Sequence, residues 1–121
     1  MVRTNGGSNV GRVIPKTAIA IADAVRRGVV SAREVADRAL DAAEASQQDL
    51  NAFTLIDRAG AIRSAEAVDR RASAGSDPGL LAGVPVALKD LIDQASLPNT
   101  AGAAFPAGLP EMDAPVVARL L

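Results

Sequence analysis

The stretch LAGVPVALKDLID, residues 81–93, decides which fold this sequence can adopt. From Val84 to Leu88, alternate residues would point to opposite faces of a strand, and both faces are apolar until Lys89. A strand that is apolar on both faces is typical of a sheet covered by helices. The stretch therefore predicts an α/β protein in which Lys89 stands at the carboxyl end of a buried strand, where the functional groups of such sheets gather.

Lys89 has two interpretations on spacing alone. In the first, its methylene stem covers apolar surface while the ammonium group reaches water or pairs with Asp90 or Asp93. In the second, partial burial favours the neutral amine, which can then accept a proton from a nucleophile. Neither carboxylate would help the second role, because a nearby negative charge stabilises the ammonium form. Both interpretations remain open at this point.

The composition removes several kinds of chemistry. The chain has 121 residues, enough for about one domain, and 49% of them are hydrophobic but only 2% aromatic, so the core must consist of Ala, Val, Leu and Ile. Cysteine and histidine are both absent, which excludes disulfides and thiolate metal sites and removes the usual general base and zinc ligand. We therefore expect neither a cofactor nor a metal.

Charge and hydropathy limit the partners. The formal net charge of −1 gives no electrostatic footprint for nucleic acid or for an anionic membrane. No stretch approaches the roughly 18 apolar residues of a membrane span, and the start MVRTNGGSNVGR lacks the apolar core of a signal peptide. We expect a cytoplasmic, soluble protein with no nucleic-acid partner and no membrane partner.

The residues before the opening stretch predict three helices between residues 17 and 72. TAIAIADAVRRG places apolar residues four apart and ends in a glycine suited to a helix terminus. Ser31 followed by Glu34 is a capping-box pattern that opens the second helix, where Glu34 can also pair with Arg38. LNAFTLID predicts a short β-like run ending at Asp57, and the third helix follows, weakened at its start by Gly60.

Composition also divides the chain into parts. Residues 1–14 are rich in glycine and polar residues and are expected to form a flexible arm. Residues 15–121 are expected to form the amino-terminal part of one domain, in which residues 73–79 concentrate Ser, Gly, Asp and Pro and predict a linker. The linker separates a helical part, residues 15–72, from residues 80–121, which carry the predicted strand, a loop and the start of a further helix.

An ordered series of motifs fills the last forty residues. A Gly-Val-Pro strand leads into Lys-Asp, a loop ends in Leu-Pro-x-Thr-x-Gly, and Asp-Ala-x-Val-Val begins a helix. The positions that carry the series are Gly83, Val84, Pro85, Lys89, Asp90, Leu97, Pro98, Thr100, Gly102, Asp113, Ala114, Val116 and Val117. This series closely resembles the amidase signature family, and residues 17–72 look like the amino-terminal helices of that family. The resemblance implies an α/β fold of which this chain is a truncated, amino-terminal piece: helices plus the first part of a mixed sheet.

The resemblance also implies an activity and a site. Members of the family hydrolyse amides through a Ser, cis-Ser, Lys triad, and the lysine of the Lys-Asp pair is the base, which here is Lys89. In the family both serines lie in a segment rich in glycine and serine after the helix that begins at Asp113, and no serine of this chain lies in such a run. We therefore expect a catalytically incomplete chain that acts on a small-molecule amide only with the remainder of the amidase domain, and whose exposed apolar surface could lead to self-association.

Two alternatives stay open. The chain could be a non-catalytic interaction module or subunit that docks a partner carrying the serines. It could also be the A subunit of a glutamine-dependent tRNA amidotransferase, which belongs to the same family and shares the lysine motif. The stretch KDLIDQASLPNTAG resembles the sequences of general bacterial amidases more than that of the amidotransferase subunit.

Overall fold

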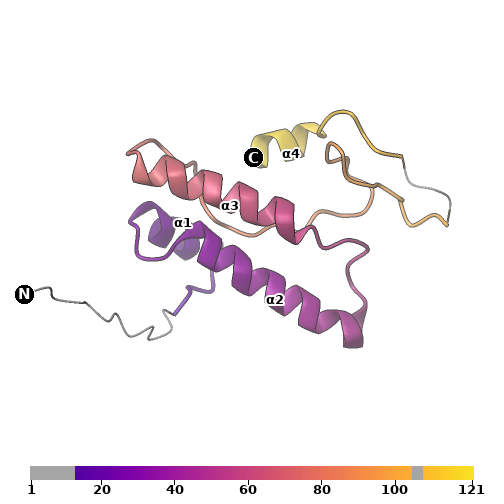
Figure 1. The fold of residues 1–121 in the computed structure, drawn as a ribbon, viewed down its shortest axis with the longest axis horizontal. Coiled ribbons are helices and arrows are strands. Elements are labelled where there is room, and N and C mark those ends of the chain that lie inside the picture. The colour runs from indigo at the N-terminus through magenta and orange to yellow at the C-terminus, as the bar shows by residue number, and fades with distance from the viewer. Residues whose placement is uncertain (1–12, 105–107) are drawn as a thin grey trace, which may run out of the picture.

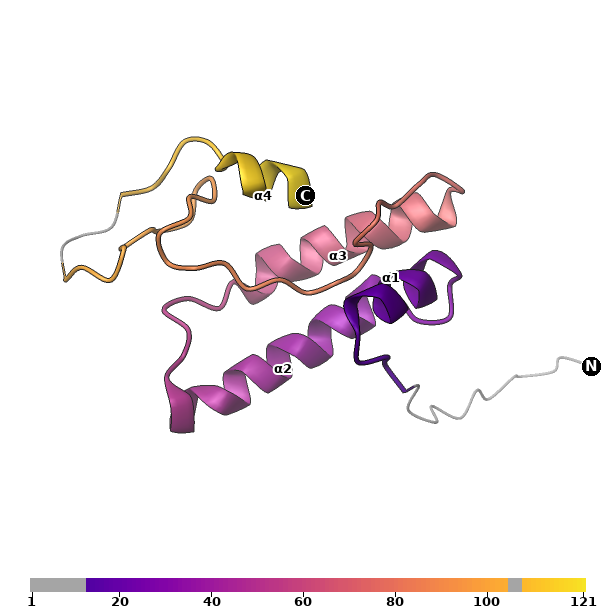
Figure 2. The same cartoon turned by 180° about the vertical axis from the view of Figure 1, so that it is seen from behind.

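The computed structural model describes residues 13–104 and 108–121, so residues 1–12 of the predicted arm lie outside the described ranges. Four helices occur in these ranges: α1 (Ala18–Arg26), α2 (Ala32–Leu50), α3 (Arg58–Ser73) and α4 (Pro115–Leu120). α2 and α3 lie side by side as an antiparallel hairpin, and α1 packs where α2 begins and α3 ends (Figure 1). Figure 2 shows the segment after α3 running back along this hairpin toward the loop that precedes α4. None of the described helices is long and apolar enough to cross a bilayer.

The three predicted helices are confirmed, and a side chain caps each of them. The hydroxyl of Thr17 accepts the N–H of Ala20 at 3.3 Å, and the hydroxyl of Ser31 accepts the N–H of Glu34 at 3.0 Å, so α1 and α2 begin where the sequence predicts. The predicted pair within α2 also forms, with 3.2 Å between the guanidinium of Arg38 and the carboxylate of Glu34. Local sequence therefore accounts for the starts of α1 and α2.

Gly60 permits the cap of α3. The Asp57 carboxylate accepts the N–H of Gly60 at 2.9 Å, and a Cβ at position 60 would lie 1.9 Å from the second oxygen of that carboxylate. A glycine here costs helix propensity, as predicted, but it leaves room for the Asp57 side chain to bond back to the helix. α3 therefore starts at Arg58, at the end of LNAFTLID.

The core is built from small aliphatic side chains where α1, α2 and α3 meet. The buried cluster consists of Ile21, Ala24, Val25, Val30, Ala32, Val35, Ala65 and Ala82. Seven of these lie in or between the helices, whereas Ala82 comes from the segment that follows the predicted linker. The helical part and the segment that leads to Lys89 therefore share one core.

Gly83 brings that segment into close contact with the helices. Its φ is +71°, and a Cβ at this position would lie 2.8 Å from Cγ2 of Val25 and 3.0 Å from Cβ of Ala32. Arg26 adds a polar tie, because its side chain donates to the carbonyl of Gly79 at 3.2 Å and also to the carbonyl of Leu80. Residues 79–83, which we call the docked segment, therefore fix where the chain departs toward Lys89.

The predicted strands were wrong for the described residues. Residues 84–88 do not form a strand, and neither does the stretch LNAFTLID, residues 50–57. Its first residue, Leu50, is the last residue of α2, and Asn51, with φ +45°, ends that helix. In the described ranges the one β-type pairing is an isolated antiparallel bridge between Asn99 and Gly108. A strand needs a neighbour to share its backbone hydrogen bonds, and none pairs with residues 84–88 here. The regular structure of the described chain is helical, and no sheet forms in it.

Candidate functional site

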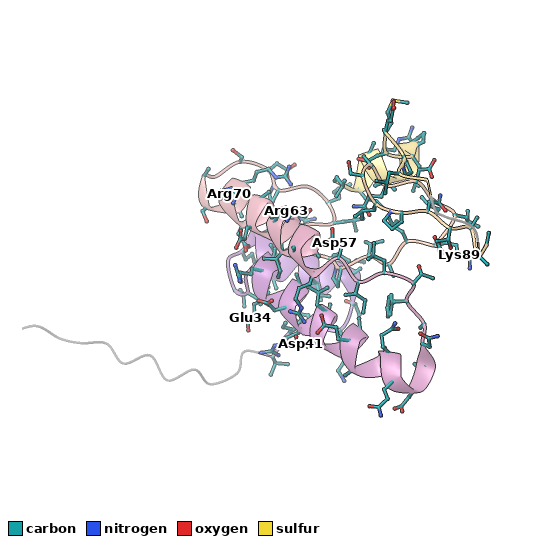
Figure 3. The ribbon with its side chains drawn as sticks, turned by 45° about the vertical axis from the view of Figure 1, so that its right-hand side comes forward. Glu34, Asp41, Asp57, Arg63, Arg70 and Lys89 are labelled. Carbon is teal, nitrogen blue, oxygen red and sulfur yellow. The ribbon has the colours of Figure 1, made fainter. Side chains whose placement is uncertain are left out.

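Lys89 lies outside the helical core. Its side chain is exposed and stands at the edge of the molecule, away from the α2–α3 hairpin (Figure 3). The chain turns directly after it, because the carbonyl of Lys89 accepts the N–H groups of Leu91 at 2.7 Å and Ile92 at 2.9 Å. In the part of the chain that the structure describes, no ion pair joins Lys89 to Asp90 or Asp93. Of the two arrangements in the first interpretation, pairing with either carboxylate is not observed in the described residues, and the side chain is exposed to solvent.

The Asp90 carboxylate binds Thr100 instead. One of its oxygens accepts the backbone N–H of Thr100 at 2.9 Å, and the other accepts the Thr100 hydroxyl. The hydrogen bond from the Thr100 hydroxyl, followed by that from the Thr100 backbone, holds the pKa of Asp90 below its ordinary value. Both oxygens of Asp90 are thus engaged by one residue ten positions later in the chain.

Two further aspartates fasten the same loop, residues 89–104, which we call the Lys89 loop. The Asp93 carboxylate accepts from the side-chain amide of Asn99 at 2.6 Å, and the Asp113 carboxylate accepts the N–H of Ala95 at 2.7 Å. The backbone carbonyl of Asp93 also accepts the N–H of Ala114, just before α4, at 2.9 Å. These bonds tie the Lys89 loop to the start of α4.

The backbone after Thr100 is tightly turned. Ala101 and Gly102 have φ values of +49° and +76°, a left-handed conformation that costs an L-residue such as alanine about 1–2 kcal/mol. The hydroxyl of Thr100 accepts the N–H of Gly102 at 3.1 Å, and the carbonyl of Thr100 accepts the N–H of Ala103 at 2.8 Å. Thr100 thus joins this turn to Asp90 and stabilises it.

The sequence interpretation missed these carboxylate bonds. It treated Asp90 and Asp93 as partners for Lys89, and it used Thr100 and Asp113 only as marks of the family pattern. The residue types carried a signal, because Asp, Asn and Thr side chains often bond the backbone of nearby turns. Spacing alone did not say which backbone groups they would meet.

A hollow beside the loop does not include Lys89. It has a volume of about 390 Å³ and is lined by Asp93, Asn99, Ala101, Gly108, Leu109 and Pro110. Lys89, which is exposed, is not among the residues that line this hollow. In the same ranges no group of three or more acidic side chains could hold a metal ion.

Comparison with known proteins identifies the class. A sequence model of the amidase family matches residues 34–121, and the chain belongs to that family. The matched region contains the docked segment, the Lys89 loop and α4, together with α2 from its third residue onward and all of α3. The family resemblance expected from the lysine motif is thus confirmed.

Individual relatives carry a more specific name. The chain is 43% identical over 105 residues to the A subunit of glutamyl-tRNA(Gln) amidotransferase from Salinispora arenicola. The aligned region covers 86% of this chain and 21% of that protein. It is 39% identical over 109 residues to the protein of that name from Acidothermus cellulolyticus, and the alignment covers 89% of this chain and 22% of that protein. It is 45% identical over 94 residues to the protein of that name from Rhodopirellula baltica, and the alignment covers 77% of this chain and 19% of that protein. The chain spans about a fifth of the length of these relatives. All three relatives carry the name of the amidotransferase subunit, which is the second alternative given above, and none is named as a general amidase.

Proposed function

We propose that this chain forms the lysine-bearing part of an enzyme that breaks carboxylic amide C–N bonds, with Lys89 as its base. The observation that carries the proposal is the family match together with the position of Lys89 in the motif Gly-Val-Pro…Lys-Asp. Residues 84–88 lead to Lys89 without a helix or strand, the chain turns immediately after it, and in the described chain Lys89 pairs with neither Asp90 nor Asp93. Its amine is thus free to meet groups supplied by other residues.

The reaction follows from the chemistry of an amine base. A neutral lysine amine, acting through a bridging serine, takes the proton of a second serine hydroxyl as that oxygen attacks the amide carbonyl. The C–N bond then breaks, the proton passes to the departing nitrogen, and water releases the acyl group from the serine. The 121 residues contain no histidine, and a lysine base is consistent with this. In the proposed enzyme, the two serines and the oxyanion donors come from the carboxyl-terminal part of an amidase domain.

Exposed apolar side chains in the second half of the chain support assembly with the remainder of an amidase domain, which would supply the other strands of the sheet. Seven of the large exposed apolar residues lie from residue 86 onward: Val86, Leu91, Leu109, Met112, Val116, Leu120 and Leu121. Exposed apolar side chains of this kind favour burial against a partner. In the proposed enzyme, residues 84–88 become a strand once neighbouring strands supply their hydrogen bonds, which gives the α/β fold of the family. The same packing would desolvate Lys89 and favour its neutral form.

The names of the relatives favour a second candidate. As the A subunit of an amidotransferase, the chain would contribute Lys89 to an enzyme that takes nitrogen from glutamine and works with other subunits. The relatives that favour it are 39–45% identical to this chain. The two candidates differ in substrate: the first predicts turnover of simple aliphatic and aryl amides, and the second predicts release of ammonia from glutamine.

Complementation tests the proposal. This chain is mixed with the serine-bearing carboxyl-terminal part of an amidase-family relative, and complex size and amide hydrolysis are measured together, with glutamine and simple amides as separate substrates. We expect a complex and turnover, and the Lys89→Ala variant should form the complex without turnover. A complex in which Lys89→Ala keeps the full rate would refute the assignment of the base. A complex with no turnover in the wild type would favour the non-catalytic docking module.

A further inference from the structure

Asp90 directly follows Lys89 in the chain, but its carboxylate bonds Thr100. The backbone N–H of Thr100 lies 2.9 Å from one oxygen, and the Thr100 hydroxyl donates to the other. That hydroxyl in turn accepts the N–H of Gly102 at 3.1 Å, so Thr100 is itself fixed in the turn that follows it. Asp90 and Thr100 are both half-buried, whereas Lys89 is exposed. A hydrogen-bonded, half-buried pair therefore includes the residue next to the exposed lysine.

The pair controls the backbone that carries Lys89. The carbonyl of Lys89 accepts the N–H groups of Leu91 and Ile92, at 2.7 and 2.9 Å, so the chain reverses at the lysine itself. The Asp90–Thr100 bonds join two residues ten positions apart and so hold the residue that directly follows Lys89. On the other side, the docked segment anchors the chain to the helices through Gly83 and Arg26.

The carboxylates nearest to Lys89 in sequence are bonded to other residues. A carboxylate next to Lys89 would stabilise its ammonium form if it could turn toward it. Thr100 occupies both oxygens of Asp90, and Asn99 occupies one oxygen of Asp93 at 2.6 Å, so the two carboxylates nearest to Lys89 in sequence are held by the loop.

We propose that Asp90 and Thr100 are positioning residues, which set the direction of Lys89 and hold the neighbouring carboxylate away from its amine. The inference rests on the proposed function of Lys89 as a base. It assigns a role to two residues whose side chains bond each other. Thr100 supplies both donors from one residue, and serine is the one substitution that retains both of them.

The first arm of the test uses this chain alone and does not depend on activity. Hydrogen exchange by NMR reports the amides of Leu91 and Ile92, which donate to the Lys89 carbonyl. Exchange should become about tenfold faster in Asp90→Ala and Thr100→Val, which corresponds to a loss of about 1.4 kcal/mol, and should stay unchanged in Thr100→Ser. The matched control is Asp77→Asn, which removes the charge of an aspartate that accepts a backbone N–H, that of Gly79 at 2.9 Å, outside this loop.

The second arm uses the active complex described above. Loss of orientation should lower kcat by about 10- to 100-fold in Thr100→Val and Asp90→Ala with KM unchanged, because misplacing a catalytic group by about 1 Å has effects of this size. Thr100→Val should also move the alkaline rise of activity to higher pH, since it frees one Asp90 oxygen to stabilise the ammonium. Asp90→Asn should not, because it removes the charge. Thr100→Ser should restore both kcat and the pH profile.

The two arms separate the inference from the function on which it rests. If the wild-type complex hydrolyses no amide, the proposed function fails, and the exchange measurement still decides whether the pair orders the backbone of Lys89. Unchanged exchange of the Leu91 and Ile92 amides in both Asp90→Ala and Thr100→Val would overturn the inference. So would an active complex in which these two variants keep the wild-type kcat and pH profile.

Discussion

The Asp69 carboxylate of α3 accepts the backbone N–H of Ala32, in the first turn of α2, at 2.7 Å. Its second oxygen accepts the N–H of Arg33 at 3.0 Å, while the N–H of Glu34 bonds the Ser31 hydroxyl. The N–H groups at the start of a helix have no partner within that helix. Three of them are satisfied at α2, and two of the three by a side chain of another helix. One carboxylate thus caps α2 and joins it to α3.

Asp69→Ala should lower the free energy of unfolding by about 1–3 kcal/mol, because it leaves the N–H of the buried residue Ala32 without its partner. Asp69→Asn keeps one acceptor oxygen and should cost less. Urea denaturation followed by circular dichroism measures both. Asp49→Ala, at an exposed position near the end of α2, is the control and should be close to neutral. An Asp69→Ala variant as stable as the wild type would show that water replaces the carboxylate.

Gly83→Ala and Gly75→Ala form a matched pair. Their φ values are nearly equal, +71° and +72°, so both variants incur about 1–2 kcal/mol for a left-handed alanine. Only at position 83 would the new Cβ meet other atoms, at 2.8 Å from Val25 Cγ2, whereas position 75 has none within 4 Å. Gly83→Ala should therefore be more destabilising by about 1–3 kcal/mol in urea denaturation. Equal losses in the two variants would contradict the close packing of the docked segment.

The pH dependence of the Lys89 loop follows from Asp90. The hydroxyl and backbone N–H of Thr100 lower the pKa of this carboxyl below its ordinary value of 3.8. A carboxyl whose pKa is lower in the folded chain stabilises the fold above its unfolded pKa and loses that contribution as pH falls through the lower, folded value. The Thr100 amide resonance should therefore hold its position from neutral pH down to about 4 and shift only below it. Asp90→Asn should abolish that titration, and a Thr100 shift centred well above the ordinary value would contradict the bond.

Lys89→Arg tests whether the proposed site needs a base at position 89 or only a positive charge. Arginine preserves a long cationic side chain at this exposed position, but its guanidinium remains protonated and cannot act as a base. In the complex with a serine-bearing part, this variant should lose amide hydrolysis nearly as fully as Lys89→Ala while assembling normally. Chain stability should be unchanged in both, since Lys89 makes no ion pair in the described residues. Turnover by Lys89→Arg at the wild-type rate would show that only the charge matters.

Local patterns predicted the helices well. The Ser31 and Glu34 pattern located the start of α2, and the apolar spacing around Ile21 and Val25 located α1, because the groups that stabilise a helix lie within four residues of one another. The strand at residues 84–88 failed for the opposite reason. Its apolar pattern describes which faces would be buried in a sheet, but pairing depends on distant chain, and none pairs with it among the described residues.

The site was predictable only in part. Lys89 could be singled out because it interrupts an apolar run, and its motif identified the family. The capping by Asp69 and the bonds from Thr100 to Asp90 could not be derived from spacing. They join groups 37 and 10 positions apart, and only the packed chain determines which donors each carboxylate meets.

The contact of Gly83 with Val25 and Ala32 bears on the order in which the protein is made. Helices α1, α2 and α3 leave the ribosome before the docked segment, and contacts close in sequence, such as those of the α2–α3 hairpin, form early. Residues 79–83 therefore reach a surface that is already folded, and the apolar run that follows is tethered there at its first residues. During synthesis this tether should act as a holding point, which keeps the apolar residues 84–88 near the helices while the following residues are added.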